Sequence, residues 1–205
     1  MSSESAEVGA IARALEALAA LAPADRPANP WARWLARPGR VPAAVLVPLL
    51  RGGADGLELL LTERAAHLPS HKGQISFPGG KLEPGEDATA AALRESAEEV
   101  GLRPDAARVI GLLDRVPTVA SAFVITPVVA EVAADFPFAP EPGEVARLLR
   151  LPWAGFRDPA AFRTERLNLA GEQVDVPFFD VAGEVVWGAT ARVIRALLDT
   201  VAALG

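Results

Sequence analysis

The segment at positions 80–102, GKLEPGEDATAAALRESAEEVGL, contains the residues whose types and spacing best suit chemistry. Residues three and four apart share one face of a helix, so Glu95, Glu98 and Glu99 are expected to project together beside Arg94. Such like charges destabilise an isolated helix, and divalent cations bound among them would remove that repulsion. Carboxylate oxygens suit Mg²⁺ or Mn²⁺, and Mg²⁺ also binds substrate phosphates. The alternative interpretation is a solvated helical face with ordinary Glu–Arg ion pairs.

Two features of the preceding loop favour the metal site. Gly79, Gly80 and Gly85 bracket a loop that leads into the helix N-terminus, where backbone amides can approach a phosphate. Glu86 stands eight residues before Arg94, so a loop that folds back over the helix would form a local ion pair. Divalent cations among these carboxylates would bind a phosphate that approaches the loop.

The same segment resembles the Nudix box, G-x5-E-x7-R-E-U-x-E-E-x-G-U, where U is a bulky apolar residue. Ser96 departs from the pattern because it stands at the first U position, and a small residue there is expected to weaken helix packing slightly without removing a ligand. The positions that match are Gly80, Glu86, Arg94, Glu95, Glu98, Glu99, Gly101 and Leu102.

The resemblance implies an α/β fold, an α/β/α sandwich around a mixed β-sheet, with the box as a loop–helix–loop. It also implies hydrolysis of a nucleoside diphosphate linked to another moiety, with Mg²⁺ or Mn²⁺ as cofactor. Glu95 and Glu99 are then the first metal ligands, and Glu98 is a further ligand or the base. Glu86 and Arg94 would hold the loop to the helix.

Many relatives place the catalytic base outside the box. Here Glu144, at the start of a predicted short helix after the proline-rich and acidic loop at 134–143, is the first candidate, and Glu141 is the second. Both can equally be solvated loop acids.

The segment at 60–80, LLTERAAHLPSHKGQISFPGG, is similar to the motif of the coenzyme A pyrophosphatase branch, L-L-T-x-R-[SA]-x3-R-x3-G-x3-F-P-G-G. Pro69 stands where that motif has an arginine, so the chain lacks at this position a guanidinium group suited to bind phosphate. Positions 187–192, WGATAR, resemble the closing W-G-x-T segment of the branch. The substrate contacts expected from this resemblance are Arg64, His71, Lys72, Gly79 and Gly80. The alternative is that Arg64 caps a strand end and Lys72 is exposed to solvent.

The implied reaction splits coenzyme A, or its thioesters, into adenosine 3′,5′-bisphosphate and 4′-phosphopantetheine or its acyl form. One rival is a Nudix hydrolase for another substrate, such as ADP-ribose, a dinucleoside polyphosphate or an oxidised nucleotide. The other rival is a Nudix-fold binding module without catalysis, although such a module would be expected to lose box carboxylates.

Composition limits the classes of partner. The chain of 205 residues is 51% hydrophobic and 22% charged, which is typical of a globular protein with a sizeable core. A net charge of −6 argues against nucleic-acid binding, so a small-molecule substrate is expected. The sequence lacks an apolar run long enough to cross a membrane, and it has no cysteine, which fits a cytoplasmic location.

The pattern of apolar residues predicts one α/β domain. Pro42 and Pro48 are expected to keep the first strand near a sheet edge or to break it. The domain proper would span 41–205, and the extension at 1–40 would form a homodimer interface or cover the sheet. The predicted helices are at 8–22, 87–100, 144–151 and 189–204, and the predicted strands are at 41–50, 57–62, 74–77, 107–116 and 123–133, with two more within 162–181.

Overall fold

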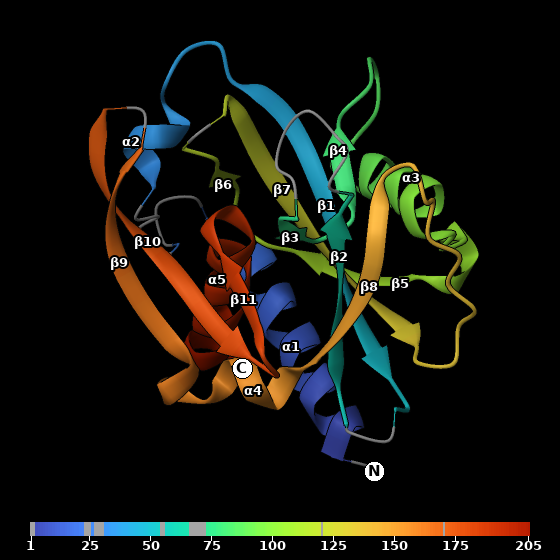
Figure 1. Ribbon diagram of the computed structural model, residues 1–205. Coiled ribbons are helices and arrows are strands. Elements are labelled where there is room, and N and C mark those ends of the chain that lie inside the picture. Colours follow the sequence, from blue (N-terminus) through green and yellow to red (C-terminus); the bar gives the residue numbers. More distant parts are fainter. Residues whose placement is uncertain are drawn as a thin grey trace.

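The computed structural model describes residues 3–22, 26, 31–53, 56–65, 73–119, 121–169 and 171–205 (Figure 1). Pro69, His71 and Lys72, which the sequence analysis singled out, lie outside the described residues. Within the described ranges, no helix is long and apolar enough to cross a membrane.

A mixed sheet of eight strands forms the centre of the molecule. Its main path runs in the order β3-β2-β1-β7-β5, while β4 and β6 pair with β1 and β7, and β8 pairs with β2. β1 and β7 are parallel along their whole length, and the other pairs are antiparallel. The strands are β1 (Val41–Arg51), β2 (Glu58–Arg64), β3 (Ile75–Ser76), β4 (Gly79–Lys81), β5 (Arg108–Leu112), β6 (Val116–Pro117), β7 (Phe123–Ala133) and β8 (Val145–Pro152).

β1 is a continuous central strand, so the prediction that Pro42 and Pro48 keep it near an edge or break it is wrong. The N–H of Leu46 donates to Pro78, away from β7, and the N–H groups of even-numbered residues along β1 therefore point to the same side. On that side the pairing with β4 ends at Val45 and the pairing with β2 begins at Leu49. Pro48 lies in this gap, so its lack of a backbone N–H costs the sheet no hydrogen bond.

The same gap marks where β2 diverges from β1. The two strands pair only at Leu49 and Leu50, after which β2 continues between β3 and β8. The segment at 75–81 fills the space between them, because β3 pairs with β2 at one end and β4 pairs with β1 at the other. This short segment leads directly into the predicted catalytic loop.

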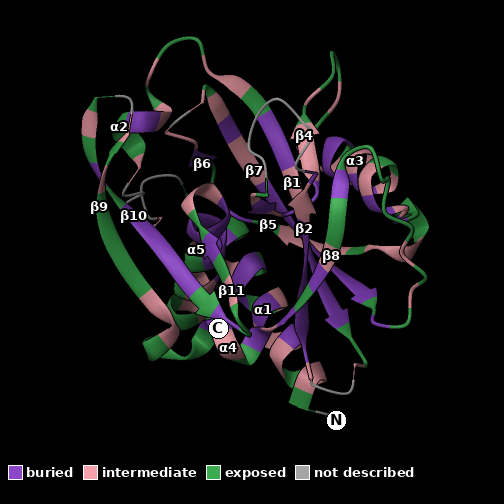
Figure 2. Ribbon diagram, in the orientation of Figure 1, coloured by how far each residue is buried: buried purple, intermediate pink, exposed green. Residues whose placement is uncertain are grey.

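Helices cover both faces of the sheet (Figure 1). Helix α3 (Ala88–Val100) packs on one face, in a core with Leu46, Leu50 and Leu60. Helices α1 (Ser3–Ala20) and α5 (Gly188–Leu204) pack on the other, in a core with Leu49 and Leu59. Neighbouring strand residues thus alternate between two cores, and the buried residues in Figure 2 follow the central strands. The predicted α/β/α sandwich around a mixed sheet is confirmed.

A second sheet of three strands, in the order β11-β10-β9, lies beside α5. Helix α2 (Ala32–Leu35) packs on it through Trp34, which is fully buried against Val174 and Val176. The predicted strand pair within 162–181 is confirmed. The elements of this part are α4 (Trp153–Arg157), β9 (Phe162–Leu169), β10 (Glu172–Val181) and β11 (Glu184–Trp187).

The prediction of a short helix at 144–151 is wrong, because Val145–Pro152 forms strand β8. β8 pairs with β2 from Glu58 to Arg64, on the side of β2 that faces away from β1 and β3. An unpaired run of backbone groups on β2 thus outweighs the weak helical preference of this segment. The predicted strand at 107–116 is also interrupted, since β5 ends at Leu112 and β6 begins at Val116.

Helix α5 holds β3 in position through one buried contact. The hydroxyl of Thr190 donates a 3.0 Å hydrogen bond to the carbonyl oxygen of Ile75, and Thr190 is only 6% exposed. The W-G-x-T segment therefore connects the C-terminal helix to the strand that precedes the predicted catalytic loop. Trp187 itself is partly exposed and stacks on Phe178 rather than entering the core.

Replacing Thr190 by Val is expected to lower the free energy of unfolding by about 1–3 kcal/mol, because the Ile75 carbonyl loses its buried partner. Urea denaturation followed by circular dichroism measures this loss. Thr200→Val is the control on the same helix, since its hydroxyl bonds only to Ala196 one turn earlier. An equal loss in both variants would contradict the bracing role of Thr190.

Candidate functional site

Local sequence signals fix both ends of α3. The side chain of Asp87 caps the helix by accepting a 2.8 Å bond from the N–H of Ala90. Gly101 ends the helix with a φ of 69°, a left-handed conformation that favours glycine. Ser96 is fully buried, and its hydroxyl donates to the Ala92 carbonyl at 2.7 Å. The hydroxyl of Ser96, at the apolar position of the box, therefore has a hydrogen-bond partner within the helix.

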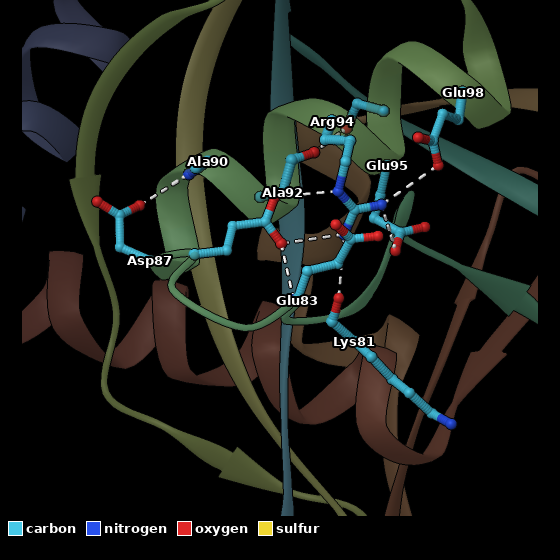
Figure 3. Close-up of polar contacts among 10 residues, drawn as sticks. Lys81, Glu83, Asp87, Ala90, Ala92, Arg94, Glu95 and Glu98 are labelled. Atoms are coloured by element: carbon cyan, nitrogen blue, oxygen red, sulfur yellow. Dashed lines mark hydrogen bonds and ion pairs between the residues drawn. The ribbon is translucent and has the colours of Figure 1, made fainter.

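Arg94 is the centre of an ion-pair cluster (Figure 3). Its Nε and Nη2 donate to the two carboxylate oxygens of Glu86 at 3.0 and 3.1 Å, which is the ion pair predicted from the sequence. Nη1 donates to Glu95 at 3.0 Å and to Glu98 at 3.3 Å, and Nη2 also donates to the carbonyl of Lys81. The hydrogen bonds from Arg94 lower the pKa of Glu86 and raise the pKa of Arg94 itself. One guanidinium therefore ties the loop to the helix.

The three box glutamates differ in environment. The side chain of Glu98 is 61% exposed and that of Glu95 is 19% exposed, although both accept from Arg94. Burial raises the pKa of Glu95, and the carboxylates of Glu98 and Glu144 add to this effect while Arg94 opposes it. Glu95 and Glu99 stand one turn apart, whereas Glu98 lies on the solvent side.

Glu99 has the most perturbed carboxyl group of the site. Burial raises its pKa to about 8, and the negative charges of Glu95 and Glu144 act in the same direction. A hydrogen bond from the backbone N–H of Gly79 and the positive charge of Arg64 oppose the shift. Glu99 therefore lies within electrostatic reach of groups from α3, β4, β2 and the turn before β8.

Arg64 and Glu144 reach this cluster from outside the box. Arg64 is the last residue of β2, and the adjoining N–H of Ala65 donates to the carbonyl of Glu144 at 2.9 Å. A β-bulge between Glu63 and Arg64 shifts the register of β2 against β8 at this point. Glu144 is exposed and belongs to a turn, in which its N–H donates to the carbonyl of Glu141. The structure thus brings both sequence candidates near Glu99.

Gly79 and Gly80 leave no room for side chains. A Cβ atom on Gly79 would overlap the carbonyl of Ala44 in β1, and a Cβ atom on Gly80 would overlap the carboxylate of Glu95. Their role in the fold is thus to let β4 approach β1 and α3 closely. The backbone N–H of Gly79 interacts with Glu99 and lowers the pKa of its carboxyl group.

The N-terminus of α3 does not form the phosphate cradle that the glycine loop suggested. Asp87 occupies it with its own carboxylate, which would repel an anion. The carboxylates of Glu95, Glu98 and Glu99 belong to the last two turns, at the other end of the helix. Among the residues that the structure describes, no three Asp, Glu or His side chains are already arranged to hold a metal ion.

Several predicted residues can be located and others cannot. The described candidates are Arg64, Gly79, Gly80, Glu86, Arg94, Glu95, Glu98, Glu99 and Glu144, whereas His71 and Lys72 fall outside the described ranges. The sequence did not predict the hydrogen bond from Gly79 to Glu99 or the brace from Thr190. The only local signals for these contacts are the paired glycines and the threonine of the W-G-x-T segment.

Comparison with known proteins agrees with this geometry. The model of the NUDIX domain matches residues 40–168. The uncharacterized Nudix hydrolase NudL of Escherichia coli K12 is 38% identical over 156 residues, which cover 76% of this chain and 80% of that protein. NudL of Cronobacter sakazakii is 40% identical over the same length and the same shares of the two chains.

A solved MutT/nudix family protein from Enterococcus faecalis has the same fold, with a TM-score of 0.53 at 16% identity over 98% of this chain and 76% of that one. The family match covers the sheet, the ion-pair cluster and the coupled carboxylates described above. The chain belongs to the Nudix hydrolase family.

Proposed function

We propose that this protein hydrolyses the pyrophosphate bond of coenzyme A, or of its thioesters, with Mg²⁺ or Mn²⁺. The products are adenosine 3′,5′-bisphosphate and 4′-phosphopantetheine or its acyl form. The single observation that carries the proposal is the electrostatic coupling of Glu95, Glu99 and Glu144, drawn from two separate parts of the chain. Carboxylates that raise one another's pKa are suited to share a divalent cation.

Glu95 and Glu99 are the ligands that would hold the cation, joined by Glu98 or Glu144. Their all-oxygen donor set fits Mg²⁺ and Mn²⁺. Within the described chain no three acids are already arranged for an ion, so two carboxylates together with water and the substrate phosphates would complete the site. When bound, the metal supplies charge neutralisation for the pyrophosphate and a water of lowered pKa.

The residues of the site position the metal ligands and supply the candidate base. Arg94 keeps Glu95 in place and anchors the loop through Glu86. The Gly79 N–H stabilises the ionised form of Glu99. Glu144 is exposed and within electrostatic reach of both buried acids, so it is our candidate for the base that takes the proton of the attacking water. Glu98 is the alternative base.

The choice of coenzyme A rests on the motif at 60–80 and on Arg64. The charge of Arg64 reaches the acid cluster, so its guanidinium is suited to pair with a phosphate beside the metal. His71 and Lys72 are proposed to assist, in place of the arginine that Pro69 replaces. The other Nudix substrates, such as ADP-ribose, remain the rival that the assay must exclude.

Purified protein incubated with coenzyme A and Mg²⁺ is expected to release adenosine 3′,5′-bisphosphate and 4′-phosphopantetheine, resolved by mass spectrometry. Glu99→Gln is expected to lower kcat/KM by at least about 100-fold, because it removes a ligand charge. Glu16→Gln, at an exposed position on α1, is the control. Consumption of ADP-ribose or a dinucleoside polyphosphate but not of coenzyme A would overturn the substrate assignment.

Glu144→Gln and Glu98→Gln separate the two candidate bases. The variant that lacks the base is expected to lose about 100-fold or more in kcat with little change in metal affinity. We expect this result for Glu144→Gln and a smaller effect for Glu98→Gln. Asp135→Asn is the control, because Asp135 is an exposed acid in the loop that precedes Glu144. Equal kcat values for Glu144→Gln and Asp135→Asn would exclude Glu144.

The metal-free protein is expected to lose stability as the pH rises from about 4.5 to about 8. Because its pKa is raised, Glu99 in the folded protein keeps a proton that it releases in the unfolded chain. The contribution of this proton to the free energy of unfolding is fully present below pH 4.5 and is lost as the pH rises through about 8. The slope from one proton is at most about 1.4 kcal/mol per pH unit.

Urea denaturation in EDTA at several pH values measures this slope, which Glu99→Gln is expected to reduce and Glu16→Gln to leave unchanged. Addition of Mg²⁺ at pH 8 is expected to stabilise the unmutated protein more than Glu99→Gln. An identical pH profile for Glu99→Gln and the unmutated protein would show that this carboxyl group is not buried as described.

A further inference from the structure

A second cavity lies away from the carboxylate cluster. It has a volume of about 450 Å³, and its described lining comes from α5, β9, β10, the residues around the start of β6 and the end of α1. No residue of α3, β2 or β4 lines it. In Figure 1 these elements lie on the opposite side of the molecule from α3. The volume is in the range of small-molecule sites.

Arg192 of α5 lines this cavity and is only 3% exposed. Its Nη1 donates a 3.2 Å hydrogen bond to the carbonyl of Pro117, and its guanidinium lies 3.9 Å from the ring centroid of Trp31. Its Nε is buried without a hydrogen-bond partner. Burial lowers the pKa of Arg192 to about 10, which still leaves it positively charged at neutral pH.

The acids around the cavity do not neutralise this charge. Asp114, Asp175 and Asp199 line the cavity, and each forms an ion pair with an arginine other than Arg192. The three partners are Arg26 at 2.5 Å, Arg166 at 2.9 Å and Arg195 at 2.7 Å, respectively. Within the described chain, Arg192 therefore has hydrogen-bond and aromatic contacts but no carboxylate.

A buried charge that pairs with no carboxylate of the described residues is costly, and an anion that enters from outside would offset that cost. Much of the remaining lining is apolar, with Leu18, Val116, Phe162, Pro177, Ala196 and Leu204 around the space. The cavity therefore places the buried guanidinium of Arg192 beside walls suited to a hydrocarbon or aromatic body.

We propose that this cavity binds an apolar monocarboxylate, whose carboxylate pairs with Arg192 and whose body packs against the apolar walls. A single negative charge matches the charge of Arg192, which pairs with no carboxylate of the described residues. A phosphate dianion would bring an excess negative charge close to the three aspartates. This site is separate from the proposed pyrophosphatase site and does not depend on its assignment.

Isothermal titration calorimetry with octanoate, octan-1-ol and octyl phosphate tests the proposal on the full chain. Octanoate is expected to bind one molecule per chain, at least about tenfold more tightly than octan-1-ol, because the alcohol cannot pair with the buried charge. Equal affinity for the alcohol, or tighter binding of octyl phosphate, would overturn the monocarboxylate assignment.

Two variants locate the binding. Arg192→Met is expected to remove the preference for octanoate over octan-1-ol. Ala203→Trp, at an exposed position that lines the cavity, is expected to block octanoate without altering the core. Ala202→Trp is the matched control, because this exposed neighbour does not line the cavity.

Octanoate binding that survives Ala203→Trp unchanged would overturn the proposal, even if Arg192→Met does not fold. Coenzyme A hydrolysis measured on the same samples reports on the other site. Loss of octanoate binding with hydrolysis intact, or the reverse, therefore distinguishes the two proposals.

Discussion

The close approach of β4 to both β1 and α3 is the constraint on which the candidate site depends. Gly79 and Gly80 have no side chains, and an added Cβ atom on either would collide with the Ala44 carbonyl or with the Glu95 carboxylate. Because the backbone can come this close, the N–H of Gly79 reaches Glu99, and the acidic face of α3 lies directly against the segment that fills the gap between β1 and β2.

This closeness has an electrostatic consequence. Glu95 and Glu99 are brought together, partly out of water, with Glu144 near both, so the raised pKa values follow from burial and like charge. Arg94 relieves part of the repulsion and keeps the loop attached through Glu86. The arrangement opposes folding locally and suits a cation, as is common where function requires clustered charge.

Helix α5 both supports strand β3 and lines the cavity that contains Arg192. Thr190 braces β3, and through β3 it supports the strand that carries Gly79. Another face of α5 lines the cavity from Arg192 to Leu204, and Arg192, two residues after Thr190, is buried there. The helix thus connects the large sheet to the three-stranded sheet, and both the brace and the cavity depend on its packing.

The sequence by itself determined the local features: the extent of α3, its capping by Gly101, the Glu86–Arg94 ion pair and the alternation of apolar residues along the strands. These follow from spacings within a few residues. Only the tertiary structure decided that β1 is central despite its prolines, that 145–152 is a strand, and that Glu144 lies near Glu99. Those outcomes depend on which distant backbone groups lack partners, and a local pattern does not encode that information.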